Sequence, residues 1–199
     1  MFTGIIGHQG LFGGYRRGRE ELLVEAPELA RRLRPGDSVS VNGVCLSLVG
    51  ADGGVLRFNL SRETLKRTTL GGFKPRARLN LELPLTLETP LGGHLVSGHV
   101  DAVGKVLRLA ERRPGRRLTL SFPPELRPFF VPKGSLAVDG VSLTVASLGP
   151  RALDVELVPL TLEGTNLGSL RAGAAVNLEC DMVGKYVYNW LVIERKPGG

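Results

Sequence analysis

Cysteine is scarce in this chain of 199 residues, which contains only Cys45 and Cys180. The two cysteines fit neither a CxxC pattern nor a metal-ligand spacing. A disulfide would require an oxidising compartment, and no other feature of the sequence indicates one. We therefore expect neither a disulfide framework nor a bound metal.

Long apolar runs are also missing. No stretch approaches the roughly 18 residues that a membrane span requires, and the N-terminal MFTGIIGHQG lacks the charged lead and apolar stretch of a signal peptide. We expect a cytoplasmic protein with no membrane association. No GxGxxG motif follows a predicted strand, which argues against a flavoreductase-type barrel with a nicotinamide-binding domain.

Acidic residues are fewer than basic ones: the chain has 19 Asp and Glu and 26 Lys and Arg, which gives a formal net charge of +7. A positive surface could attract nucleic acid. The basic residues, however, are scattered over turns, for example at 112–113 and 116–117, without interleaved aromatic residues. A solvated surface explains this pattern best, and a nucleic-acid-binding barrel is the weakest alternative.

The sequence contains an internal repeat. PGDSVSVNGVCLSL (35–48) aligns with PKGSLAVDGVSLTV (132–145) at an offset of 97 (132 − 35), and six of the fourteen positions are identical. Residues 59–82 align with 156–179 at the same offset without a gap, and FTGII resembles VSGHV (96–100) at an offset of 94 (96 − 2). Two copies of this length exclude a solenoid and imply two similar domains.

Each copy is predicted to be β. Residues 38–41 alternate polar and apolar, which is the period of a half-buried strand. Asn42-Gly43 follows these residues and precedes the apolar stretch 44–49, and an Asn-Gly pair between two such stretches is the strongest short-range hairpin signal. In the second copy, Asp139-Gly140 occupies the equivalent positions. We expect an all-β protein of two tandem six-stranded antiparallel barrels. Further strands are predicted at 55–60, 78–83, 118–122, 153–158 and 175–180, and short helices at 27–33 and 124–129.

The repeat divides the chain into a first domain at 1–93, a second at 94–182 and a C-terminal helix and tail at 183–199. Apolar residues in this last region recur at the spacing of one helix face, and no third domain remains for them to cover. We therefore expect a subunit contact there. The residues are Val183, Tyr186, Val187, Trp190 and Leu191.

The stretches MFTGII, VNGVCLSL, ETLKRTTLG, GGHLVSGHVD, KGSLAVDGVSLTV and TLEGTNLG occur in this order, and together they resemble riboflavin synthase over essentially the whole chain. The resemblance implies that each half is a Greek-key barrel that binds one 6,7-dimethyl-8-ribityllumazine. It also implies a homotrimer with sites between the first barrel of one chain and the second barrel of its neighbour. The implied transferase reaction converts two lumazines into riboflavin and 5-amino-6-ribitylamino-uracil without a cofactor. An association with lumazine synthase is a further expectation.

The two halves differ where this chemistry is expected. Cys45 becomes Ser142, Gly36 becomes Lys133, and Ile5 becomes His99. Two pockets of one shape with different reactive groups suit one ligand that is bound twice in two roles. Divergence of duplicated halves is the alternative explanation.

The implied reaction removes a proton from the ring methyl group of one lumazine and attacks a ring carbon of the other. Histidine suits the proton transfer because its unperturbed pKa lies near neutrality. His99 matches a pocket position of the family and is assigned to the second half, although a lone histidine is more often structural. His94 lies five residues earlier and on a strand would point to the opposite face, so shared metal ligation is not expected. A contact with the substrate or a neighbouring chain is expected for His94.

Four more residues complete the catalytic candidates. Cys45 matches the family's ligand-contacting cysteine, although a buried, inert cysteine is the common alternative. Ser38 aligns with an active-site serine, and Phe2 belongs to a segment expected to lie over the bound ring as an aromatic wall. Asp181 is assigned only because it matches a family position, and the same holds for the binding residue Lys133, since exposed Asp and Lys are usually only solvated.

The expected ligand-binding residues lie in short stretches of both halves. Backbone groups next to glycine can approach the ring edge closely, and hydroxyl and acidic groups suit the ribityl chain. The full set is Gly4, Ile5, Ile6, Cys45, Leu46, Ser47, Asn59, Leu60, Ser61, Arg62, Glu63, Thr64, Gly98, His99, Val100, Lys133, Ser142, Leu143, Thr144, Val158, Pro159, Leu160, Thr161, Leu162 and Glu163.

The main alternative is a non-catalytic lumazine- or flavin-binding protein on the same duplicated fold. Such a protein needs one good pocket and has no need of reactive groups in both. Here the candidate residues are present in both halves, which favours the enzyme.

Overall fold

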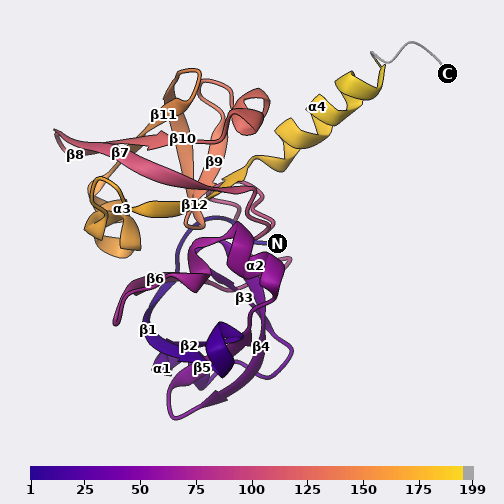
Figure 1. Cartoon of the computed structure of the whole chain (residues 1–199), viewed down its shortest axis with the longest axis vertical. Coiled ribbons are helices and arrows are strands. Elements are labelled where there is room, and N and C mark those ends of the chain that lie inside the picture. Colours follow the sequence, from indigo (N-terminus) through magenta and orange to yellow (C-terminus); the bar gives the residue numbers. More distant parts are fainter. Residues whose placement is uncertain (195–199) are drawn as a thin grey trace.

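The computed structural model describes residues 1–194 and contains two closed antiparallel barrels of six strands each (Figure 1). In both barrels, strands that are not consecutive in the chain pair with each other, so the expectation of two tandem Greek-key barrels is confirmed. The first barrel has the strand order β1-β2-β5-β4-β3-β6 and the second β10-β11-β8-β7-β12-β9. The strands are β1 (His8–Arg16), β2 (Glu21–Glu25), β3 (Ser38–Val41), β4 (Val44–Asp52), β5 (Val55–Asn59), β6 (Arg78–Glu82), β7 (Ala102–Arg112), β8 (Gly115–Ser121), β9 (Ser135–Val138), β10 (Val141–Leu148), β11 (Ala152–Leu157) and β12 (Ala175–Cys180).

Short helices connect the strands and close the barrel ends. The predicted helix at 27–33 ends earlier, at Ala30, and the one at 124–129 is a 3-10 helix. The α-helices are α1 (Pro27–Ala30), α2 (Arg62–Arg67), α3 (Pro159–Gly164) and α4 (Met182–Glu194), and the 3-10 helices are η1 (Arg17–Arg19), η2 (Thr69–Gly71), η3 (Pro124–Phe129) and η4 (Asn166–Ser169).

Each barrel encloses its own apolar core. Leu22, Phe58 and Leu81 are fully buried in the first, and Leu120 and Leu136 in the second. Alternating strand residues point inward, as the period of two requires. The two cores are separate, so the barrels are held together by contacts at their junction and not by a shared apolar core.

The two predicted hairpin turns meet at the junction of the barrels. Asn42 and Gly43 both have positive φ (45° and 78°), as do Asp139 and Gly140 (46° and 79°), which is the type I′ pattern. A Cβ on Gly43 would lie 2.6 Å from the backbone nitrogen of Gly140, and one on Gly140 would lie 2.7 Å from that of Gly43. The barrels therefore approach this closely only because both turns carry glycine.

A buried amide network surrounds these turns. Asn80 donates to the Asp139 carbonyl at 2.9 Å, and Asn177 donates to the Asn42 carbonyl at 2.8 Å, so each half contributes the same bond to the other. Asn166 donates to the Asp139 carboxylate at 2.9 Å. Burial raises the pKa of Asp139 to about 6, and the hydrogen bonds from Asn177 and Asn166 oppose this shift. These bonds satisfy polar groups whose burial would otherwise be costly.

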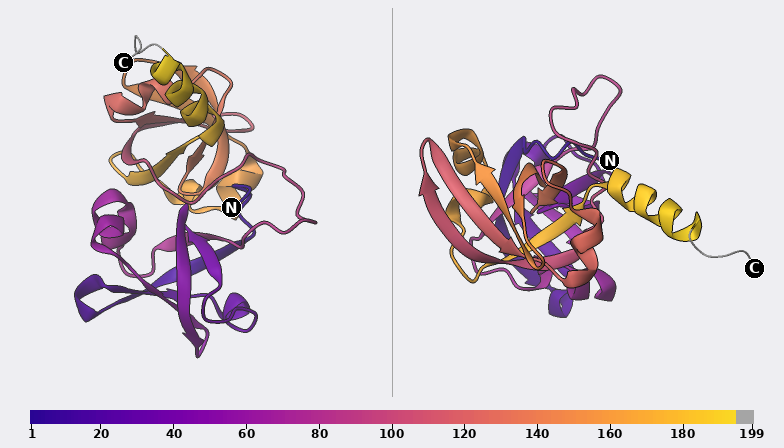
Figure 2. Two further views of the ribbon diagram at one scale, coloured as in Figure 1. Left: turned by 90° about the vertical axis from the view of Figure 1, so that its right-hand side faces the viewer. Right: turned by 90° about the horizontal axis from the view of Figure 1, so that it is seen from above.

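Helix α4 leaves the second barrel and projects away from it (Figures 1 and 2). Lys185 pairs with Asp101 at 2.7 Å, and the Tyr188 ring lies 5.1 Å from that of Phe129. Within residues 1–194, no helix is both long and apolar enough to cross a bilayer. The last five positions of the expected region 183–199 lie outside the described residues. The predicted apolar stripe lies on α4, and all five of its residues are exposed: Val183, Tyr186, Val187, Trp190 and Leu191.

We predict that Gly43→Ala lowers the free energy of unfolding by roughly 2–5 kcal/mol, combining the left-handed backbone with the contact at Gly140. Gly53→Ala is the matched control, because Gly53 also has positive φ (56°) but nothing within 4 Å of its Cβ position. The control should lose only about 1–2 kcal/mol. Urea unfolding measures both, and equal losses would contradict the importance of the close approach.

Candidate functional site

The N-terminal segment pairs with the segment that precedes the second barrel. The Phe2 N–H donates to the Val96 carbonyl at 2.8 Å, and the Val96 N–H donates back to Phe2 at 3.0 Å. Phe2 is fully buried with Val96 and Ala137. Its ring is thus buried in this structure, where Phe2 packs the N-terminal segment against the second half.

These two segments cross over between the barrels. The Ser142 N–H of the second barrel donates to the Gly4 carbonyl at 2.8 Å, and the Cys45 N–H of the first barrel donates to the Gly98 carbonyl at 2.9 Å. The segment that carries His99, which the sequence assigned to the second half, thus hydrogen-bonds to the first barrel through Gly98.

Packing of the following residues shows the same crossing. Ile6 packs against the core of the second barrel, and Val100 packs against the core of the first. Each barrel thus receives one edge of its candidate site from the segment that begins the other half.

Two buried carboxylates hold the crossing segments. Glu82 accepts from the N–H and hydroxyl of Thr3 (2.7 and 2.6 Å) and from the Gly4 N–H (3.1 Å). Glu179 does the same for Ser97 (2.6 and 2.7 Å) and Gly98 (3.0 Å). Burial raises the pKa of both carboxyl groups, and these hydrogen bonds oppose the shift.

Glycine is required on both segments. Gly4 and Gly98 have φ of 74° and 83°, and a Cβ on either would lie 2.6 Å from the Cβ of Ser142 or Cys45, respectively. The backbone therefore touches strand β10 or β4 directly, as expected for groups that line a ligand site.

A pocket of about 490 Å³ opens on the second barrel. Seven predicted residues line it: Ile5, Lys133, Ser142, Leu143, Thr144, Val158 and Thr161. Five more were not predicted: Gly92, Gly93, Ser135, Ala146 and Glu156. Ser135 and Glu156 lie 97 positions after Ser38 and Asn59, so transferring those two predictions across the repeat would have identified them.

Lys133 occupies a strained backbone position in this pocket. Its φ is 68°, in the left-handed region, where the first half carries Gly36 with φ of 96°. A non-glycine residue there costs about 1–2 kcal/mol. The exchange of glycine for lysine is thus unfavourable for the backbone, and it places an ammonium group in the pocket.

His94 lies against this pocket through Ser142. Its Nδ1 is 2.7 Å from the Ser142 Oγ, and its backbone N–H donates to the Thr3 carbonyl at 3.1 Å. Burial lowers the pKa of His94, and the charge of Asp181 opposes this shift. The imidazole is therefore neutral at pH 7, and its buried Nε2 has no partner among the described residues. A neutral Nδ1 can accept from the Ser142 hydroxyl and turn the serine oxygen into an acceptor for a ligand.

Asp181 does not line the pocket. It precedes α4 and accepts from the Val183 N–H at 3.0 Å, which is the bond of a helix cap. Its charge acts on His94 from this position.

The equivalent surface of the first barrel brings together Cys45, Ser38 and His99. Cys45 and Ser38 are half-buried on neighbouring strands, and His99 is exposed on the crossing segment. Ser61 caps α2 by accepting from the Thr64 N–H at 3.0 Å. Cys45 and the segment that carries His99 thus meet at the first barrel, whereas Lys133 lines the pocket on the second.

The remaining predicted binding residues fall into two groups. Leu46 and Leu60 are buried in the first core, and half-buried Leu162 packs against the second. The others are exposed on strands β4 and β5 or on α2 and α3: Ser47, Asn59, Arg62, Glu63, Pro159, Leu160 and Glu163. Within residues 1–194, no group of three or more His, Cys, Asp or Glu side chains is placed to hold a metal ion.

A family model described as the lumazine binding domain matches residues 3–84 and again 97–181. The riboflavin synthase of Mycobacterium tuberculosis is 41% identical over 198 residues, which covers 94% of this chain and 96% of the relative. That of Actinobacillus pleuropneumoniae is 36% identical over 199 residues, which covers 99% and 92%. This chain belongs to the riboflavin synthase family.

Solved structures show the same fold. The crystal structure of LumP complexed with riboflavin superposes with a TM-score of 0.84 at 22% identity, covering 90% of this chain and 99% of that one. LumP complexed with 6,7-dimethyl-8-(1′-D-ribityl) lumazine gives 0.81 at 21%. The family match assigns a lumazine-binding domain to each half, and the segment that precedes each barrel hydrogen-bonds to the other barrel.

The crossing predicts which residues act on the same ligand. In titrations with 6,7-dimethyl-8-ribityllumazine, Ile5→Ala and Ser142→Ala should be coupled by about 0.5–3 kcal/mol, because both side chains line one pocket. Ile5→Ala combined with Cys45→Ala is the control and should be additive within about 0.5 kcal/mol. Coupling of Ile5 with Cys45, and not with Ser142, would contradict the crossing.

Proposed function

We propose that this protein catalyses the riboflavin synthase reaction, in which two molecules of 6,7-dimethyl-8-ribityllumazine give riboflavin and 5-amino-6-ribitylamino-uracil. The observation that carries the proposal is the pair of unequal sites on one duplicated frame. Cys45 and His99 belong to one, and Lys133 and Ser142 to the other. The relatives named riboflavin synthase support the reaction.

The two sites divide the chemistry. In the first, His99 and the Cys45 thiol lie beside the bound ring, with Ser38 on the adjacent strand. In the second, the ammonium group of Lys133 and the Ser142 hydroxyl face the ring, and His94 orients the hydroxyl. The charge of Asp181 acts on His94. A four-carbon unit then passes from one bound lumazine to the other, and no cofactor is required.

We also propose a homotrimer in which the first barrel of one chain faces the second barrel of another. The exposed apolar face of α4 supports a contact between chains, because soluble monomers rarely expose contiguous apolar surface of this kind. A cytoplasmic location and an association with lumazine synthase complete the proposal.

We expect the purified protein to form riboflavin from the dimethyl-ribityllumazine alone, consuming two lumazines per riboflavin. A non-catalytic binding protein on this fold would bind the lumazine without turnover, so riboflavin absorbance separates the two functions. A stoichiometry of one lumazine per riboflavin, or a requirement for a second carbon source, would refute the proposed reaction.

The arrangement between chains is tested by mixing two defective variants, Cys45→Ala and Lys133→Ala, after dissociation and reassembly. In a closed ring assembled from equal amounts, about a quarter of the interfaces would pair an intact first barrel with an intact second barrel. Activity should then exceed that of either parent.

The control is Cys45→Ala mixed with His99→Ala. Both changes affect the first barrel, so no interface regains an intact site and activity should stay low. Unchanged activity in demonstrably mixed Cys45→Ala and Lys133→Ala oligomers would contradict a site shared between chains.

A further inference from the structure

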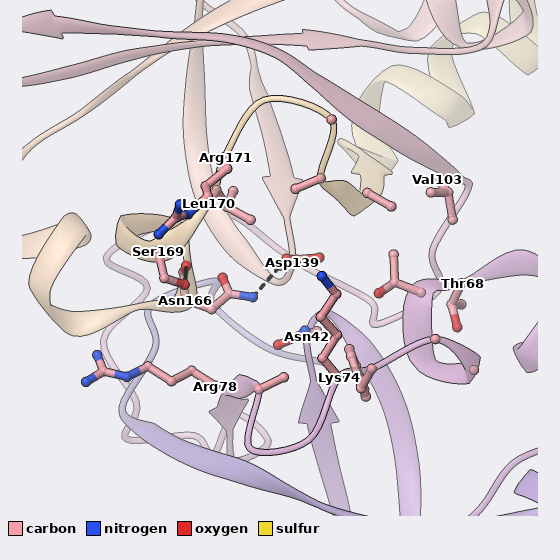
Figure 3. A pocket seen from close by; sticks show the side chains of 18 of the residues that line it. Asn42, Thr68, Lys74, Arg78, Val103, Asp139, Asn166, Ser169, Leu170 and Arg171 are labelled. Carbon is pink, nitrogen blue, oxygen red and sulfur yellow. Dashed lines mark hydrogen bonds between the residues drawn. The ribbon is translucent and has the colours of Figure 1, made fainter.

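A second cavity lies between the two barrels and shares no lining residue with the pocket on the second barrel. It has a volume of about 970 Å³ and is bounded mainly by two loops that the repeat relates, 68–78 and 165–175 (Figure 3). This volume lies at the upper end of the range for small-molecule sites. We call it the junction groove.

Four basic side chains line the junction groove: Arg19, Lys74, Arg78 and Arg171. Among the residues that the structure describes, none of the four forms an ion pair or a side-chain hydrogen bond, although Arg19 lies 5.9 Å from the Tyr15 ring. Clustered cations along a concave surface focus a positive potential. An anion would relieve their mutual repulsion.

The described lining of the junction groove contains almost no acidic residues. Among the lining residues that the structure describes, Asp139 is the one with a carboxyl group, and it is buried and already hydrogen-bonded to Asn166 and to the backbone of Asn177. Figure 3 shows the hydrogen bond between Asn166 and Asp139, with the Lys74 side chain directed toward Asp139. The Asp139 carboxylate thus already accepts two hydrogen bonds, and the four basic side chains remain available to a ligand.

Part of the lining is apolar and suits a flat ring. Leu65, Phe73 and Leu170 contribute to it, together with the small side chains of Ala77 and Ala174. Arginine recognises phosphate through paired N–H donors, and apolar or aromatic walls accept planar heterocycles. Cationic and apolar surfaces in one groove match a ligand with both features.

We propose that the junction groove binds a nucleotide, with its phosphates on the basic side chains and its base on the apolar wall. This site is separate from the lumazine pockets and lies within one chain, at the contact between its two halves. A ligand there would contact loops from both halves at once.

The test is calorimetric titration of the full protein with ADP. ADP should bind, and Arg78→Ala or Arg171→Ala should each weaken binding about tenfold, since each removes charge-assisted hydrogen bonds. Both arginines are exposed, so the thermal midpoints should not change. Arg151→Ala is the matched control, because Arg151 is exposed and lies outside the groove, and it should bind ADP like the parent.

Two component probes and a competitor complete the test. Adenosine and pyrophosphate should each bind more weakly than ADP, because each offers one half of the contacts, and saturating riboflavin should leave ADP binding unchanged. Absence of ADP binding, binding unaffected by both groove variants, pyrophosphate binding as tight as that of ADP, or displacement by riboflavin would each overturn the proposal.

Discussion

The close approach of two glycine turns controls the arrangement of this molecule. Asn42-Gly43 and Asp139-Gly140 meet without intervening side chains, and the amides of Asn80 and Asn177 bond across them. This contact fixes how the barrels face each other. In this arrangement each crossing segment reaches the neighbouring barrel and accepts a backbone hydrogen bond from Ser142 or Cys45.

The crossing segments explain how one duplicated frame acquires two different chemistries. The first barrel brings Cys45 together with the segment that carries His99, whereas the second brings together the Ser142 hydroxyl, the Lys133 ammonium group and the apolar side chain of Ile5. Cys45, from the first half of the sequence, thus meets a segment from the second half, and Lys133 and Ser142, from the second half, meet Ile5 from the first. Substitutions in both halves shape each pocket.

The sequence predicted those features that depend on local pattern. The alternation at 38–41 and the Asn-Gly and Asp-Gly turns predicted the hairpins, and the repeat predicted two barrels. Strand β1 was not predicted, because HQGLFGGYR does not alternate and its pairing with β2 shifts register between Phe12 and Gly14.

Long-range placement was the part that the sequence could not supply. The burial of Phe2, the hydrogen bond between Gly98 and Cys45, and the bond between His94 and Ser142 depend on the approach of segments far apart in the chain. Periodicity reports which face of a strand is buried, and it carries no information about which barrel a connecting segment will contact. Seven of the twelve described lining residues of the second pocket were nevertheless found, because the resemblance to the riboflavin synthase family implied them.

The contact between the halves has the form of a two-fold symmetric dimer interface enclosed within a single polypeptide, because each half gives the other the same bonds that it receives. A half released from this chain would lack one wall of its own pocket and would expose the bare backbone of its glycine turn. It could regain both by pairing with a second copy of itself. Covalent linkage of the halves removes that dependence on concentration, and it also frees the two pockets from having to be identical.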